Sequence, residues 1–385
     1  MKRQGDRWKR KLNYRSFLVL ISISLVRIVD INLHHQCFLS REEDSRTFGF
    51  SLAMSNDYLA VGDPNANQVA IYRRNKLNQW SRTKKITPPV DSTTHRIGSG
   101  FGYDLAIDED ILVVGAYSQK RNTKNLEDFQ LNEPIISTSG AVYQTNLAQN
   151  SMVKRLDEFK QGEIVGAVVA ADEGKIVFSR SRIEPDRPRN ATTEIVVLFD
   201  GQRKYLSLPT DKFSRSVAAI ALHDDLLLVG SITDGQEKAW LFDLINSPHT
   251  VPQSISVASN LLVGTSVAVN QQFLVIGERI GHRYSKSVQT VKTIIRRIDD
   301  DGEMEIDGYG KVSLDNHILS RLRFGRPFYR EANILELFFL DDNATPHRIL
   351  KRKNVTRALV HNSLLTTVQM KSGRKKLCVE SISYI

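Results

Sequence analysis

Arginine and aromatic side chains occur together in one short stretch of the chain, residues 320–331. Arginine and aromatic residues are the usual components of protein-binding hot spots, and a guanidinium group also suits an acidic ligand. Arginines recur in the stretches 180–193 and 278–287. Our candidate binding residues are Arg321, Arg323, Phe324, Arg326, Tyr329, Arg330, Arg279, Arg283, Tyr284, Arg187 and Arg189. The alternative, that these are ordinary residues of charged and solvated loops, stays open here.

The chain contains none of the short motifs that carry common enzymatic chemistry. It has no P-loop, no His-Glu-x-x-His and no Gly-x-Ser-x-Gly. Gly98, Gly100 and Gly102 are spaced in part like a dinucleotide fingerprint, but a strand-like segment follows them instead of a helix. The acidic run 299–303 contains Asp301-Gly302, which is more typical of a hairpin turn than of a calcium loop. We therefore predict no catalytic residue, no metal site and no cofactor.

The positive charge of the chain is concentrated at its N-terminus. The formal net charge is +10, but the first 16 residues alone hold seven Lys/Arg against one Asp. Most of the excess is therefore a property of this segment, and it gives little reason to expect a nucleic-acid partner.

The basic segment is followed by a short apolar one, residues 17–26, in which only Ser22 and Ser24 are polar. A bilayer-spanning helix needs about 20 apolar residues, so ten after a basic start fit a signal peptide or a signal anchor better. We expect residues 1–30 to direct the chain to the secretory pathway, with the remainder secreted or membrane-anchored outside the cytoplasm. A disordered basic tail is the alternative. In a glycosylating compartment the sequons at Asn190, Asn343 and Asn354 become acceptors.

One pattern recurs along the rest of the chain and must position the candidate residues. Residues 48–53 (FGFSLA) lead into 58–62 (YLAVG), and residues 101–106 (FGYDLA) lead into 111–115 (ILVVG). Five weaker copies follow, and the second strand of the seven copies is expected to reach residues 62, 115, 179, 230, 277, 320 and 367. Seven units of about 50 residues indicate an array of small β units.

Each unit contains enough strand-like segments for one propeller blade. Short polar turns such as Asn56-Asp57 separate two β-rich runs, and a third and often a fourth run follow. In the first strand we expect Phe48, Phe50, Leu52 and Met54 to share one face. We predict an all-β chain whose residues 31–385 form a seven-bladed β-propeller of four-stranded blades.

The two clearest copies also resemble a known family. Phe-Gly-x-Ser/Asp-Leu-Ala, then Val-Gly-Asp-Pro or Val-Gly-Ala-Tyr, then Val-Ala-Ile-Tyr or Gly-Ala-Val-Tyr resembles the FG-GAP repeat of the N-terminal propeller of integrin α chains. The resemblance implies an extracellular binding or adhesion module. Many such repeats carry a calcium loop between the first two strands, but the turns here are too short for one, so calcium is not expected.

The resemblance also suggests how the ring closes. The seventh copy lacks a fourth strand, and in the family the N-terminal strand completes the last blade, so we expect residues 35–40 to do so here. Cys37 would then lie on the outer strand beside Cys378, where a disulfide could lock the ring. Two unrelated thiols are the alternative.

The loops between the second and third strands all emerge on one face of a propeller. Over the seven expected loops (63–67, 118–138, 180–193, 231–238, 278–287, 320–331 and 371–376) we count 19 Lys/Arg and 10 Asp/Glu. We therefore predict a binding module that presents a basic loop face to a protein or an acidic glycan, with membrane contact only through an N-terminal anchor. A propeller hydrolase or lyase with its site at the mouth of the central channel is the first alternative. An intracellular scaffold is the second, because fold alone does not decide function.

Overall fold

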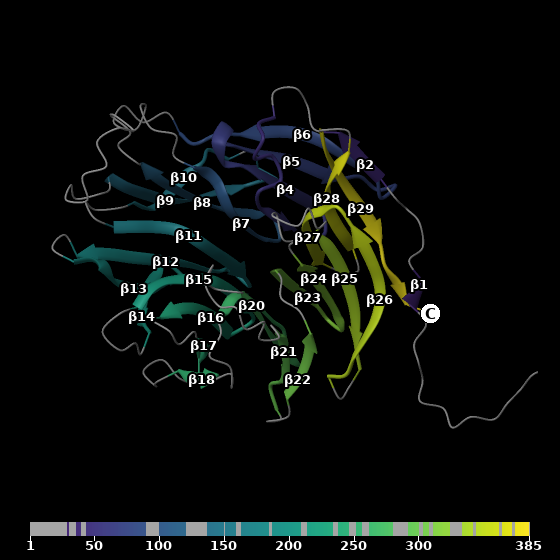
Figure 1. Cartoon of the computed structure of the whole chain (residues 1–385). Helices are drawn as coiled ribbons and strands as arrows, with labels where there is room; N and C mark the ends of the chain where they lie inside the picture. Colours follow the sequence, from purple (N-terminus) through teal and green to yellow (C-terminus); the bar gives the residue numbers. More distant parts are fainter. Residues whose placement is uncertain are drawn as a thin grey trace, which may run out of the picture.

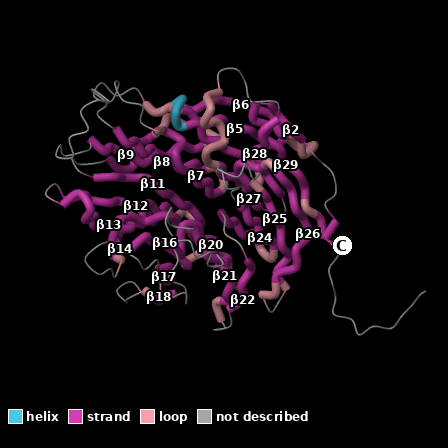
Figure 2. The backbone as a smooth tube through the Cα atoms, viewed as in Figure 1, coloured by secondary structure: helices cyan, strands magenta, loops and turns pink. Residues whose placement is uncertain are grey.

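The computed structural model describes residues 29–30, 36–39, 44–89, 100–120, 137–149, 151–158, 163–184, 187–208, 214–233, 238–245, 252–255, 262–279, 292–299, 303–307, 311–323, 333–341, 344–361, 364–371 and 374–384. Strands dominate this part of the chain, and one short 3-10 helix, η1 (Pro64–Ala66), interrupts them (Figure 2). Within these residues no helix has the length and apolarity that crossing a membrane requires.

The strands form seven antiparallel four-stranded sheets, each built from consecutive strands except the last. The first three blades are β3 (Leu52–Met54), β4 (Tyr58–Asp63), β5 (Gln68–Arg74) and β6 (Trp80–Ile86); β7 (Phe101–Asp108), β8 (Ile111–Lys120), β9 (Ser137–Asn146) and β10 (Lys154–Glu158); and β11 (Glu163–Asp172), β12 (Lys175–Glu184), β13 (Arg187–Phe199) and β14 (Gln202–Ser207).

The next three blades repeat this arrangement. They are β15 (Ser214–His223), β16 (Leu226–Thr233), β17 (Lys238–Asp243) and β18 (Gln253–Ile255); β19 (Leu262–Val269), β20 (Phe273–Arg279), β21 (Lys292–Arg297) and β22 (Glu303–Asp307); and β23 (Lys311–Asp315), β24 (Ile318–Arg323), β25 (Ile334–Leu340) and β26 (Pro346–Lys353). The predicted seven-bladed propeller is confirmed. All seven residues at which the second strand was expected to end lie within β4, β8, β12, β16, β20, β24 and β28.

The blades stand side by side around a central axis. In Figure 1 the first strands of the blades lie nearest the middle and the last strands lie at the periphery. Seven apolar clusters fill the seven interfaces between neighbouring blades, one cluster to each interface. Each sheet is thus covered on both faces, which explains why the middle strands are almost continuously apolar.

The seventh blade is completed by a strand from the beginning of the chain. Its sheet order is β2 (Gln36–Leu39), β29 (Arg374–Ser381), β28 (Leu364–Lys371) and β27 (Val355–His361). The predicted closure by an N-terminal strand is therefore confirmed. A second short pair, β1 (Val29–Asp30) with β30 (Ser383–Tyr384), lies beyond it, so the last two residues of the expected N-terminal segment also pair with the end of the propeller.

Cys37 and Cys378 lie directly opposite each other in the pairing of β2 with β29. Their Cα atoms are 4.1 Å apart and their sulfur atoms form a disulfide. The Cys378 side chain is buried. The covalent bond therefore joins the two ends of the ring across 341 positions of sequence.

The Phe-Gly element of the repeat is a turn or a bulge instead of a regular strand. The expectation that Phe48, Phe50, Leu52 and Met54 share one face of the first strand is therefore wrong. Gly49 and Gly102 have φ angles of +76° and +89°, and β3 begins only at Leu52. The amides of Gly49 and Phe50 both donate to the carbonyl of Gly62, at 2.9 and 3.1 Å. Because of this turn, Phe50 does not share the buried face of Phe48 and packs toward Tyr103 of the second blade.

The glycine that ends the repeat allows neighbouring blades to approach closely. A Cβ atom at Gly115 would overlap the carbonyl oxygen of Gly166 on the next blade. We predict that Gly115→Ala lowers the free energy of unfolding by about 1–3 kcal/mol, because a rigid backbone must shift. Urea unfolding measures the change. Gly174→Asn is the control, since a Cβ atom at Gly174 would meet nothing within 4 Å and asparagine tolerates its φ of +73°; equal destabilisation by both variants would contradict the explanation.

Candidate binding site at the ring axis

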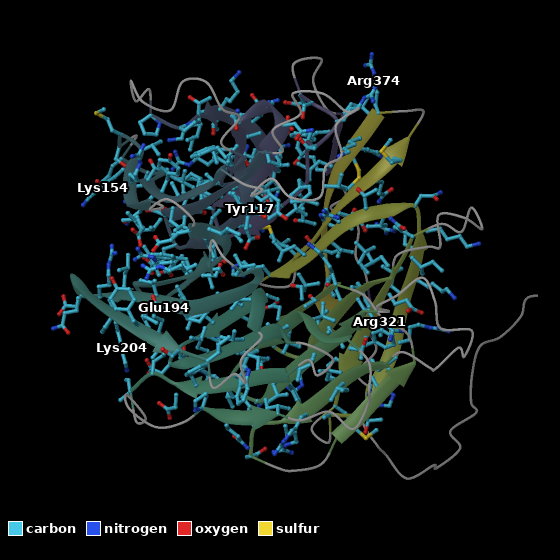
Figure 3. All side chains as sticks on the ribbon, turned by 60° about the vertical axis from the view of Figure 1, so that its left-hand side comes forward. Tyr117, Lys154, Glu194, Lys204, Arg321 and Arg374 are labelled. Carbon is cyan, nitrogen blue, oxygen red and sulfur yellow. A yellow bond between two sulfur atoms is a disulfide. The ribbon has the colours of Figure 1, made fainter. Side chains whose placement is uncertain are left out.

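The structure corrects the expected position of Arg321. Strand β24 continues to Arg323, so Arg321 lies in the sheet and not in a loop. Its side chain is 2% exposed and forms an ion pair of 2.7 Å with Glu336 on β25. It also donates to the carbonyl of Ile306 in the fifth blade, at 3.3 Å. Arg321 therefore joins two blades and does not face a ligand (Figure 3).

The other predicted binding and glycosylation residues are only partly within the described chain. Arg323 and Arg279 are the last residues of β24 and β20, and Arg187, Arg189 and Asn190 belong to β13, so these expected loops begin or end in strand. The exposed Asn354 lies between β26 and β27. Outside the described residues lie Phe324, Arg326, Tyr329, Arg330, Arg283, Tyr284 and Asn343.

A different group of residues, which the sequence did not reveal, converges where the inner strands begin. We call this the loop end of the propeller, because the loops between the second and third strands lie at the same end. The group comprises Phe50, Tyr103, Asp104, Lys311 and Arg357, which we call the axial cluster. Each belongs to the beginning of an inner strand or to the turn before it, and the blades of origin are the first, second, sixth and seventh. Inner strands that start at the same end of a propeller bring these side chains toward one axis.

Aromatic rings form one side of the axial cluster. The Arg357 guanidinium carbon lies 5.0 Å from the centroid of the Phe50 ring, in cation–π geometry. The ring centroids of Phe50 and Tyr103 are 5.0 Å apart. Those of Tyr103 and Tyr117 on β8 are also 5.0 Å apart, and this second pair is edge-on. Arg357 also donates to the carbonyls of Phe50 and Thr356, which fixes it across the seam between the seventh and first blades. Tyr117 lies toward the inside of the ring, whereas Lys154 lies at its outer edge (Figure 3).

The charges of the axial cluster are poorly balanced. Burial raises the pKa of the Asp104 carboxyl to about 6, against the opposing effects of a hydrogen bond from the Val169 amide at 2.9 Å and of the Lys311 charge. Burial lowers the pKa of Lys311 and of Arg357, and repulsion from Arg357 lowers that of Lys311 further. Lys311 nevertheless stays exposed to solvent. Lys311, which is open to solvent, thus lies within the field of a second, half-buried cation and of one carboxyl group.

One further lysine approaches this group from the seventh blade. Lys375 donates to the carbonyl of Phe48 at 2.6 Å, and its pKa is lowered by burial and by the charge of Arg357. Asp63 acts on it in the opposite direction, but that carboxylate already accepts hydrogen bonds from Thr47 and Gln68. The loop end of the axis is therefore positive.

The opposite end of the axis carries carboxylates that connect the turns of successive blades. Asp108 accepts from the Gly174 amide and Asp172 accepts from the Asp224 amide, both at 2.6 Å. His223 lies between Asp172 and Asp224, and one ligand atom of each lies within 4.8 Å of the others. Asp172 thus serves a backbone amide of the next blade, and the Asp224 carboxylate accepts from the side-chain amide of Gln271 at 3.0 Å, so we assign the three residues a structural role.

Comparison with known proteins adds the following. No protein-family model matches the chain, and no curated protein matches it. Among solved structures it is similar to the β-propeller domain of the Trilobed protease from Pyrococcus furiosus, with 16% identity over 73% of this chain and 83% of that one and a TM-score of 0.44. It is also similar to the Dos1 propeller, with 10% identity over 87% and 78% and a TM-score of 0.48. An ancestral GH74 enzyme shares 13% identity over 87% of this chain and 48% of that one, with a TM-score of 0.48.

Proposed function

We propose that this chain is an extracellular or lumenal binding module of the FG-GAP type, which presents the loop end of its propeller to an acidic ligand, either a protein or an acidic glycan. One observation carries the proposal: Arg357 of the seventh blade lies over the Phe50 ring of the first blade, and the charges of Arg357 and of the carboxyl group of Asp104 both act on Lys311 of the sixth blade. Arg357 is half-buried, and a cation withdrawn from water is unfavourable until an anion joins it. An acidic ligand therefore gains attraction here that a neutral one does not.

The location outside the cytoplasm is supported by the seam between the chain ends. A disulfide joins Cys37 and Cys378, and such bonds persist mainly in oxidising compartments. The basic and apolar segment before the propeller fits the same location. Any membrane contact would come through that segment, and Asn354 offers an exposed acceptor for a glycan.

A hydrolase or lyase at the ring axis is the second candidate function, and one observation favours it. Asp104 has a pKa of about 6, which suits a general acid or base, and Tyr103 precedes it. Glycoside hydrolysis, however, uses two carboxyl groups placed around the scissile bond. Among the described residues, Asp104 is the one carboxyl group whose charge acts on Lys311. We therefore prefer binding without turnover.

Neutralising the exposed lysine of the axial cluster tests the proposal. We expect Lys311→Gln to weaken binding to immobilised acidic glycans or acidic proteins by about tenfold, the size of a single close charge contact. The control is Lys154→Gln, the same change at an exposed position on outer strand β10. Surface plasmon resonance at two salt concentrations gives the comparison. Equal binding by both variants, or failure to find any acidic ligand, would contradict the proposal that the loop end of the axis binds an acidic ligand.

A further inference from the structure

We propose that the axial cluster binds a carboxylated sugar, a uronate unit of an acidic glycan, with the sugar carboxylate between Lys311 and Arg357 and the sugar ring against the rings of Phe50 and Tyr103. This inference rests on the proposed function and narrows it to one ligand class. It makes the ligand carboxylate a competitor of Asp104 for Lys311.

Most charged groups on the elements around Asp104 are already engaged by other residues. Of the charged groups on the strands around β7, Asp63 on β4 is held by Thr47 and Gln68. Glu163 on β11 is paired with two arginines of β12, and Asp172 lies at the opposite end of the axis. Lys311 is the charged group whose field acts on Asp104 among the described residues. A second carboxylate would balance the remaining positive charge of Lys311 and Arg357.

The aromatic rings of the axial cluster favour a sugar over an acidic peptide. Phe50, Tyr103 and Tyr117 form a row of half-buried rings beside the cations. The electronegative face of an aromatic ring attracts the polarised C–H groups of a pyranose. An aspartate or glutamate side chain would use the cations but has no ring of C–H groups to set against the exposed parts of these aromatic rings. A cationic ligand is disfavoured because Arg357 already lies over Phe50.

The competition with Asp104 makes binding depend on pH. Asp104 loses its charge below about pH 6, while a uronate, an ordinary carboxylic acid, stays ionised to about pH 4. Removing the negative charge beside Lys311 strengthens its attraction for the ligand. Affinity should therefore rise as pH falls from 7.5 to 5.5, by about tenfold, which lies within the usual range of coupling between two sites.

The experiment is calorimetric titration with a tetrasaccharide of alternating glucuronate and N-acetylglucosamine, at pH 7.5, 6.5 and 5.5. The probes for comparison are an N-acetylglucosamine tetramer, which lacks the charge, and tetraglutamate, which lacks the sugar. We expect Asp104→Asn to bind tightly at pH 7.5 with little pH dependence, because the amide still accepts from Val169 but carries no charge. Asp57→Asn, exposed in the turn at the other end of the first blade, is the matched control.

The outcomes distinguish this inference from the proposed function. Support requires preference for the acidic tetrasaccharide, its loss in Lys311→Gln, and a weaker effect of Tyr103→Leu on tetraglutamate than on the sugar. Equal binding of tetraglutamate with no effect of Tyr103→Leu would overturn the sugar assignment and leave an anion-binding module. Failure of every anionic probe at all three pH values would overturn both. If the affinity of Asp104→Asn for the tetrasaccharide depends on pH as strongly as that of the native chain, Asp104 does not compete with the ligand.

Discussion

Replacing Cys37 and Cys378 with alanine is expected to lower the free energy of unfolding by about 4–5 kcal/mol. The disulfide closes a loop of 341 positions, and a long loop restricts the unfolded chain strongly in the chain-entropy description. The bond also joins the only pair of described strands, β2 and β29, that comes from distant parts of the sequence within one blade. Without it, the outer strand of the seventh blade is held by its hydrogen bonds and apolar contacts alone.

Urea unfolding of oxidised protein, reduced protein and the double variant gives the comparison. Reduction should move the unfolding midpoint of the native chain to that of the double variant, and it should leave the variant unchanged. Alanine is chosen because Cys378 is fully buried, and a hydroxyl there would add its own desolvation cost. A midpoint that does not respond to reductant would show that the seam is stabilised by packing.

The change Glu336→Gln is expected to lower the free energy of unfolding by about 3–5 kcal/mol. Arg321 and Glu336 are each 2% exposed and form an ion pair of 2.7 Å between them. Glutamine keeps the volume but removes the charge that balances a guanidinium group buried between two blades. The measured quantity is again the urea midpoint, at neutral pH.

Two further variants identify the cause. Arg321→Met combined with Glu336→Leu should recover most of the loss, because replacing both charges with apolar groups removes the uncompensated cation. Asp299→Asn removes the charge from the exposed pair of Arg297 and Asp299, which is 2.6 Å long with a 66% exposed aspartate, and should leave the urea midpoint nearly unchanged. If the double variant is as unstable as Glu336→Gln, packing at this position outweighs charge.

The number of blades and the position of each second strand could be predicted because they depend on local patterns, whereas the closing strand was predicted from the family resemblance and the missing fourth strand of the seventh copy. The alternation of apolar and polar residues, the turn residues and the repeats can all be read from neighbouring positions in the sequence. Where one copy of the repeat is degenerate, the other copies still show the pattern. The Phe-Gly element was misjudged because Phe48, Phe50, Leu52 and Met54 alternate as in a strand, while the positive φ of Gly49 turns the backbone.

The axial cluster could not be predicted because its members are separated by up to 307 positions, as Phe50 and Arg357 are. Each is a single polar or aromatic residue at the start of an apolar strand, and only the ring brings them together. The available signal was the aromatic residue that follows Phe-Gly in both clear copies. Arg321 was misplaced for a related reason: β24 is buried on both faces, so its neighbours show no alternation that would reveal a charged residue inside.

The seam between β2 and β29 also has a consequence for how the chain is made. On the ribosome, Cys37 emerges hundreds of residues before Cys378, so the outer strand of the seventh blade is synthesised before any of its three partners. Phe48 and Met54 likewise stay uncovered until Leu364 and Val368, which pack against them in the finished ring, have been synthesised. Until the last blade is made, the nascent chain therefore exposes one strand edge and one apolar face, and the disulfide can form only after Cys378 has been synthesised.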